Sequence, residues 1–315
     1  MVKVYYDNRT EAEKLQKMTK NKTAVALGQF DSMHIGHTEI ISKVVKYAKD
    51  NEMVSLVHIF ENNPIEVIKG EKIRSVNTLE KRLEILEGLG VDIVCVARFD
   101  TEYMNIEYKD FVSLYLRDMF NAAIVLVGYN YRFGKGGVGT SERLREECEK
   151  YGIGVNVVPG IEQDGEVVSS TRIKEKLAMG DAEGAANMLG RYFSVKGEVV
   201  RGNQIGGKML GFPTANIEMP GEIVMPKFGV YATRTRVGNE IYKSITNIGS
   251  KPTIENGTFC IETHIDGDFG ELYGEIVEVE FCKFLRDIKK FDSLDGLRKQ
   301  LERDKQNMVQ KGREE

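Results

Sequence analysis

Two histidines lie three residues apart in the segment Gly28–His37, which reads GQFDSMHIGH and follows a short apolar run. His34 and His37 stand where a strand would end and a helix would begin, and the first N–H groups of a helix attract anions. Imidazoles there can donate to phosphate oxygens and stabilise charge that develops at phosphorus. Ordinary helix-cap histidines are the alternative. Two of only four histidines fall in this segment, which favours a phosphate-handling site, and a zinc site is disfavoured because no third ligand is evident.

A second segment, Val127–Gly139, is rich in glycine and contains Arg132 and Lys135. Gly-rich loops can hold phosphates through backbone N–H groups, and the two cations would add charge. A surface loop rich in turn residues is the alternative, and this segment alone is a weak signal.

A third segment, Val168–Lys174, places three successive hydroxyl residues and Arg172 at the start of a helical stretch. Hydroxyls and a guanidinium at a helix start can bind an anion. A simple Ser/Thr N-cap explains the same residues equally well. All three segments follow apolar runs, so their relative position depends on the fold.

In the first half of the chain, apolar runs alternate with helical stripes. Strands are predicted at 23–30, 54–60, 91–99, 122–131 and 153–161, and helices at 35–50, 78–89, 107–120, 141–151 and 173–189. This alternation is typical of βαβ units, which build a doubly wound, Rossmann-like parallel sheet covered on both faces. Ligands of such sheets bind beyond the carboxyl ends of the strands, so we expect the three segments to cluster there.

The second half has a different pattern, in which strand-like runs follow one another without helices. Strands are predicted at 194–200, 228–237, 240–249, 258–265 and 274–281, with Gly238–Asn239 as a two-residue hairpin turn. An antiparallel β-barrel or sandwich is expected, closed by an amphipathic helix that begins at Ser293. The fold class is therefore α/β plus β, with domains predicted at 1–186 and 187–315.

Charge and composition exclude several classes of protein. The 315 residues carry a net charge of −4, all of it in the first 186 residues, so no broad basic surface for nucleic acid is predicted. No apolar run approaches the ~20 residues of a membrane span, and the amino-terminal residues do not resemble a signal peptide. The four cysteines lack metal-ligand spacing and are predicted to be free thiols. A cytoplasmic protein with small-molecule substrates is expected; the sequence carries no signal for oligomeric state.

Several motifs together resemble the prokaryotic bifunctional riboflavin kinase/FMN adenylyltransferase (FAD synthetase) family. In the first half these are the GxFDxxHxGH segment, the Asn-x-Arg-Phe-Gly loop and SSTRI. In the second half they are GGKMLGFPTAN (206–216), FGVYA (228–232), NIGSKPT (247–253), IETH (261–264), LYG (272–274) and FLR (284–286). The resemblance covers almost the whole chain in the expected order, and GFPTAN with the later glutamate is the most specific part.

The resemblance implies that riboflavin is phosphorylated by ATP to FMN, and that FMN is then adenylylated by a second ATP to FAD with release of pyrophosphate. It implies Glu262 as the base of the kinase reaction, and Thr214 and Asn216 as ligands of Mg²⁺ and of ATP. His34 and His37 would stabilise the transition state of adenylyl transfer, and Arg286 would bind flavin. The remaining ATP-binding residues that it implies are Gly28, Phe30, Asp31, Asn130, Ser169, Ser170, Thr171, Arg172, Gly206 and Gly211.

Two residues depart from the family pattern. Ser32 stands where glycine is usual, which would cost strain if the position needs a positive φ. Asn63 stands where the family usually has a histidine before the proline, and it could alter a flavin or phosphate contact. Both positions lie in the adenylyltransferase half, so a riboflavin kinase without adenylyl transfer is the alternative function. A tRNA-linked or other adenylating enzyme is less favoured because the charge distribution gives no basic surface. A pure binding module leaves both sets of phosphate loops unexplained.

Overall fold

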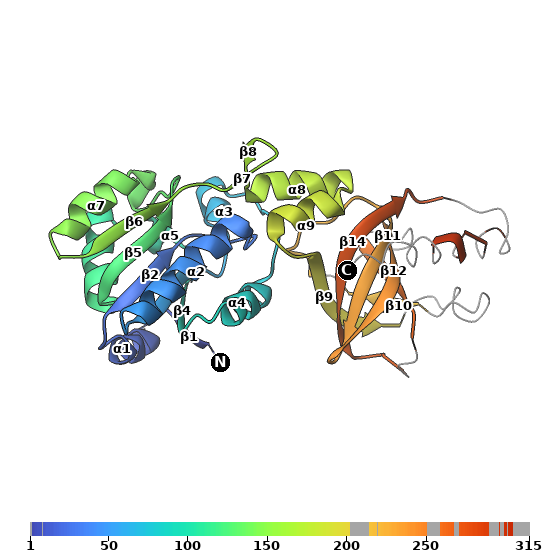
Figure 1. Cartoon of the computed structure of the whole chain (residues 1–315), viewed down its shortest axis with the longest axis horizontal. Coiled ribbons are helices and arrows are strands. Elements are labelled where there is room, and N and C mark those ends of the chain that lie inside the picture. The colour runs from blue at the N-terminus through green and yellow to red at the C-terminus, as the bar shows by residue number, and fades with distance from the viewer. Residues whose placement is uncertain are drawn as a thin grey trace. The chain divides into compact units, whose positions relative to one another are not determined.

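The computed structural model describes residues 2–7, 9–201, 214–218, 220–250, 259–267, 271–289, 296, 299–300 and 302–304 (Figure 1). Contacts divide the chain into two compact units, Met1–Ser170 and Thr171–Glu315. The domain boundary near residue 186 stays a prediction. In the part of the chain that is described, no helix has both the length and the apolar character needed to cross a membrane.

The first unit is built on a six-stranded sheet in the order β1-β4-β3-β2-β5-β6, and every neighbouring pair is parallel. The strands are β1 (Lys3–Tyr6), β2 (Thr23–Leu27), β3 (Val54–Phe60), β4 (Ile93–Ala97), β5 (Ala122–Gly128) and β6 (Gly154–Val158). The doubly wound parallel sheet predicted from the alternating pattern is confirmed. Strand β1, only four residues long and at the sheet edge, was not predicted.

Helices cover both faces of this sheet (Figure 1). They are α1 (Arg9–Met18), α2 (Ile35–Asp50), α3 (Pro64–Lys69), α4 (Leu79–Gly88), α5 (Thr101–Met104), α6 (Tyr108–Asp110), the π-helix η1 (Phe111–Met119), the 3₁₀ turn η2 (Lys135–Gly137) and α7 (Ser141–Glu149). Side chains of β2 alternate between two cores, because Ala24 packs with α2 and α4 whereas Val25 packs with η1 and α7. A short hairpin of β7 (Glu162–Gln163) and β8 (Glu166–Val167) precedes the end of the unit.

The helix predicted over 107–120 is interrupted. It forms one turn of α-helix and then a π-helix, in which the Phe120 N–H donates to the Tyr115 carbonyl at 2.8 Å. The wider turn brings the Tyr115 hydroxyl to 2.8 Å from Oδ2 of Asp7, at the end of β1. The hydrophobic spacing alone did not reveal this change of period, and π-turns are frequent near functional sites.

His58 on β3 is fully buried among aromatic rings, including Phe60, Tyr103 and Phe120, and desolvation lowers its pKa to about 4. In the unfolded chain the pKa of this histidine is near 6.5. As the pH falls, His58 is therefore protonated in the unfolded chain before it is protonated in the folded protein. We expect the free energy of unfolding of the first unit to decrease by about 3 kcal/mol from this group between pH 6.5 and pH 4.

Thermal unfolding of the wild type and of His58→Leu, followed from pH 7.5 to pH 4, tests this pH dependence. The variant should lose less stability than the wild type over that range, whatever its stability at pH 7.5. Parallel pH curves would show that His58 does not stay neutral in the folded protein.

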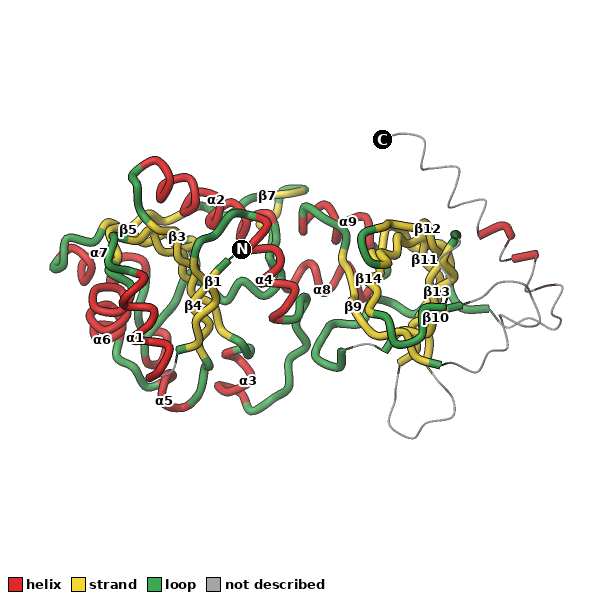
Figure 2. Tube along the Cα trace, turned by 90° about the horizontal axis from the view of Figure 1, so that it is seen from below, coloured by secondary structure: helices red, strands yellow, loops and turns green. Residues whose placement is uncertain are grey.

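The second unit holds a closed antiparallel barrel of six strands in the order β10-β13-β12-β11-β14-β9 (Figure 2). The strands are β9 (Phe193–Val200), β10 (Ala215–Ile217), β11 (Gly229–Val237), β12 (Glu240–Ser250), β13 (Phe259–Ile265) and β14 (Ile276–Arg286), preceded by α8 (Ser170–Met179) and α9 (Ala182–Leu189). The predicted barrel is confirmed, as is the hairpin turn, where Gly238 has φ +58°. Residues 296, 299–300 and 302–304 are helical, but the predicted start of that helix at Ser293 lies outside the described residues.

One wall of the barrel core is polar. Five buried hydroxyl groups form a chain of hydrogen bonds of 2.8–2.9 Å across β11, β12 and β13, in the order Thr235, Ser244, Thr233, Thr246 and Thr263. Because each hydroxyl has a hydrogen-bonding partner, the barrel tolerates these groups in its core. They point to the opposite face from Glu262, which alternates with Thr263 along β13.

Candidate functional site

The first predicted loop joins β2 to α2 and has an unusual backbone. Phe30 and Met33 are almost fully buried and adopt left-handed conformations, with φ of +46° and +48°. The Asp31 carboxylate between them accepts a hydrogen bond from the Val76 N–H at 2.9 Å, and the Asn77 amide donates to the Asp31 carbonyl at 2.9 Å. These contacts hold a strained loop in one conformation, as is common at functional sites.

The two histidines of this loop lie together at the start of α2. His34 is the N-cap, and its Nδ1 accepts a hydrogen bond from the His37 N–H at 3.2 Å. Since Nδ1 accepts, the neutral His34 ring carries its proton on Nε2, which makes Nε2 a donor. The two rings stack with centroids 3.6 Å apart. A side chain at Gly28 would meet the Phe30 ring at 2.7 Å, so glycine is required there.

Strand order places this loop at the switch point of the sheet. From β2 the chain continues to β3 and β4 on one side, whereas β5 and β6 lie on the other side. The carboxyl ends of β2 and β5 are therefore the expected ligand position in an open α/β sheet. The loops after these two strands are the first and second predicted segments.

The second loop is more ordered than its composition suggests. Phe133 is buried in the core and exchanges both backbone hydrogen bonds with Gly139. Gly134 has φ +70°, and any side chain there would lie 2.7 Å from Tyr108. Asn130, Arg132 and Lys135 are exposed around this anchored turn.

The third segment is connected to the first by side chains. Val168 is buried and precedes Ser169, and Ser170 begins α8. The Ser170 hydroxyl lies 2.8 Å from the Ser32 hydroxyl in the first loop. Thr171 is exposed and Arg172 is half-buried in the first turn of α8.

Arg82 on α4 was not predicted as part of the site. Its side chain is buried and donates to the backbone carbonyls of Phe60 at 2.8 Å and Glu61 at 3.2 Å, at the carboxyl end of β3. It thereby covers carbonyl oxygens at the carboxyl edge of the sheet, where an anion would otherwise meet negative dipoles. In the sequence Arg82 is one charged residue of a polar helix, and no pattern distinguishes it from its neighbours.

The two positions that depart from the family pattern have clear local roles. Ser32 does not adopt a positive φ, so the serine causes no left-handed strain; the left-handed residues are its neighbours. Asn63 is the N-cap of α3, and its Oδ1 accepts a hydrogen bond from the Ile65 N–H at 3.0 Å.

In the barrel, strand register aligns three of the residues predicted for the second half. Asn216 on β10 pairs with Glu262 on β13, which pairs with Asn247 on β12; the row continues through Val230 on β11 to Arg286 on β14. Direct partners on antiparallel strands share a face and lie ~5 Å apart. Glu262 and Asn247 are half-buried and Asn216 is buried, so oxygen-bearing groups gather on one outer face.

Other predicted residues of the second half have different positions. Thr214, two residues before Asn216, is half-buried. Gly206 and Gly211 lie outside the described residues. Among the residues that the structure does describe, no cluster of three or more His, Cys, Asp or Glu side chains could hold a metal ion.

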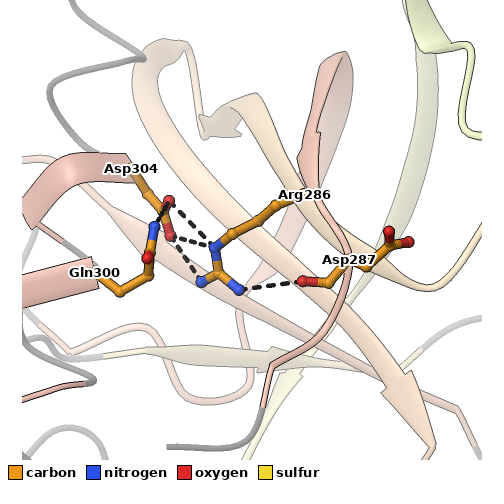
Figure 3. Close-up of polar contacts among 4 residues, drawn as sticks. All are labelled: Arg286, Asp287, Gln300 and Asp304. Carbon is orange, nitrogen blue, oxygen red and sulfur yellow. Dashed lines mark hydrogen bonds and ion pairs between the residues drawn. The ribbon is translucent and has the colours of Figure 1, made fainter.

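Arg286 is held by the terminal helical residues (Figure 3). Its Nε and Nη2 donate to the buried Asp304 carboxylate, at 3.1 Å and 2.8 Å from Oδ2, and Nη1 donates to the Asp287 carbonyl at 3.3 Å. Gln300 donates to the same carboxylate at 2.9 Å. The orientation of the guanidinium is therefore fixed, and no sequence pattern singles out Asp304.

Comparisons with known proteins agree with both halves. A family model described as FAD synthetase matches residues 16–172, and one described as riboflavin kinase matches residues 189–311. A protein of Haemophilus influenzae named bifunctional riboflavin kinase/FMN adenylyltransferase is 32% identical, covering 89% of this chain and 91% of its own. A protein of the same name from Listeria monocytogenes is 33% identical, with 90% of each chain covered. A crystal structure titled as a macrolide-efflux protein from Streptococcus pneumoniae has a TM-score of 0.85, with 28% identity, and covers 93% of this chain and 96% of that chain.

Proposed function

The chain belongs to the bifunctional riboflavin kinase/FMN adenylyltransferase family, and we propose that it converts riboflavin to FMN and FMN to FAD, with ATP as donor in both steps. It is a transferase with two activities. One observation carries this proposal: each of two unlike units matches its own family model. The alternative, a kinase that has lost adenylyl transfer, is not favoured, since Ser32 brings no positive φ and Asn63 caps a helix.

In the proposed kinase reaction, the 5′-hydroxyl of riboflavin attacks the γ-phosphorus of ATP, and Glu262 accepts the hydroxyl proton. A carboxylate suits this role if it reaches the hydroxyl directly. The cross-strand pairing of Glu262 with Asn216 supports the assignment, because it brings the base next to an amide proposed to bind ATP. Gly206 and Gly211 are proposed to bind ATP, and Arg286 to bind flavin.

Mg²⁺ is proposed to be held by Thr214 and Asn216. A hydroxyl and an amide oxygen are suitable donors for a hard cation that keeps several waters, and the neighbouring carboxylate of Glu262 adds negative charge. When bound, the ion would neutralise charge on the ATP phosphates.

In the proposed adenylyl transfer, an FMN phosphate oxygen attacks the α-phosphorus of ATP, and pyrophosphate leaves. His34 and His37 stabilise the charge on the phosphates, and the His34 tautomer with Nε2–H supplies a donor for this purpose. The other proposed ATP-binding residues of this unit are Gly28, Phe30, Asp31, Asn130, Ser169, Ser170, Thr171 and Arg172. No covalent intermediate is needed, because positioning and charge neutralisation suffice.

We also propose that the protein works in the cytoplasm on small molecules without a nucleic-acid or membrane partner. Its buried free thiols Cys95 and Cys148 support a reducing compartment. As an enzyme that binds FMN and FAD, it is proposed to be a flavoprotein.

Product analysis tests the proposed function. Purified protein with riboflavin, ATP and Mg²⁺ as the only additions should yield FMN first and then FAD, separated by chromatography. FMN, ATP and Mg²⁺ without riboflavin should yield FAD with one pyrophosphate for each FAD formed. FMN without FAD in both assays would favour the kinase-only alternative, and neither product would refute the proposal.

A further inference from the structure

Ser32 lies inside the first loop and has no contact with a substrate in the proposed function. Its side chain is fully buried, and its hydroxyl lies 2.8 Å from that of Ser170, a residue 138 positions away. The bond joins the loop that carries His34 and His37 to the first residue of α8. The family pattern that the first loop resembles has glycine at this position, and glycine carries no hydroxyl.

The loop around Ser32 leaves its hydroxyl little freedom. The left-handed residues Phe30 and Met33 flank it, and Asp31 fixes the loop to Val76 and Asn77. A hydroxyl on a loop held at several points is a preorganised partner, because its orientation costs little further entropy when a ligand binds.

Proton counting sets the direction of the bond when an anion is present. Each serine hydroxyl has one proton and two lone pairs. Phosphate oxygens without protons only accept hydrogen bonds, so Ser170 must donate its single proton to contact one. The Ser170 oxygen then accepts from Ser32, and cooperative polarisation strengthens a donor that itself accepts a hydrogen bond.

We propose that Ser32 is a positioning residue for adenylyl transfer, which orients the Ser170 hydroxyl as a donor to the phosphate tail of ATP. The inference rests on the proposed function, because it assigns Ser170 to ATP. It gives the serine a role in ATP affinity, where the family pattern has a glycine.

The experiment measures FAD formation from FMN with ATP varied, in the full chain and in Ser32→Ala, Ser170→Ala and the double variant. Removing one such hydrogen bond should lower kcat/KM for ATP about three- to tenfold in Ser32→Ala. The KM for FMN and the kinase reaction of the same protein should stay unchanged. The double variant should be no worse than Ser170→Ala, because Ser32 acts only through Ser170.

The outcomes separate this inference from the proposed function. If the wild type forms FAD and Ser32→Ala has an unchanged kcat/KM for ATP, the inference alone is overturned. The same holds if the double variant loses activity by the product of the losses in the two single variants. No FAD from the wild type would overturn both. Ser32→Gly, which removes the hydroxyl and adds no volume, repeats the test if the alanine variant does not fold. Equal losses for ATP and FMN, with a lower melting temperature, would indicate a structural role and contradict the inference.

Discussion

Replacement of Glu262 by glutamine should abolish FMN synthesis and leave FAD synthesis from supplied FMN intact. The substitution keeps the size and shape of the side chain, but an amide cannot accept the proton of the riboflavin hydroxyl. Loss of a general base typically costs 10²–10⁴-fold in rate, so kcat for FMN formation should decrease by at least about a hundredfold. FMN and FAD formation are measured separately by chromatography.

The matched control is Glu280→Gln, on the same barrel. Glu280 is half-buried on β14, where it pairs with Ser194 and Arg234 rather than with the row that contains Asn216. This variant should retain both activities. If Glu262→Gln loses both activities while it remains folded, the two reactions do not use separate sites, and the modular assignment is wrong.

A motif was enough to identify Glu262 as a candidate base, but it could not predict which residues lie beside it. Its neighbours depend on strand pairing. Asn216 and Glu262 become neighbours only because three-residue β10 adds to β13 in one register. A strand of three residues has too short a pattern to predict, and Pro213–Asn216 reads equally well as a turn. Long-range register depends on the whole closed barrel, so it is not contained in any local window of the sequence.

In the first unit the local signals were stronger. The buried strands β2 and β4 are continuous apolar runs, as parallel strands covered on both faces should be, and α2 follows its predicted range. His34 was recognisable because residue type and position agreed: it follows a strand and caps a helix. The position of the loop at the switch point depends on the strand order, because β3 and β4 lie on one side of β2 and β5 and β6 lie on the other.

Residues that support the site from behind could not be predicted. Arg82 binds backbone carbonyls, and Asp31 accepts from the backbone of Val76. Any chain segment has carbonyl and N–H groups, so the acceptors of Arg82 leave no trace in the sequence. The Arg286–Asp304 pair has the same character, because many carboxylates follow Arg286 and only the folded chain selects one.

Loss of the two histidines should have the opposite effect to loss of Glu262. Since the His34 side chain also caps α2, alanine would remove the cap and the imidazole together, so His34→Asn is the sharper variant. Asparagine keeps a strong N-cap acceptor but lacks the Nε2 donor. We expect His34→Asn and His37→Gln each to lower kcat for FAD formation about 10²–10³-fold, the cost of one donor to a developing oxyanion.

FMN formation by the same variants is the internal control, because the kinase reaction is assigned to the barrel. Asp100→Ala, which removes the exposed N-cap of α5 without touching the first loop, controls for loss of a helix cap in the same unit. It should retain FAD formation. Normal FAD formation in His34→Asn, at ATP concentrations well below KM, would show that the imidazole donates nothing to the transition state. Normal FAD formation in both His34→Asn and His37→Gln would leave the backbone N–H groups of α2 as the donors of this loop and would contradict the assignment of the two histidines.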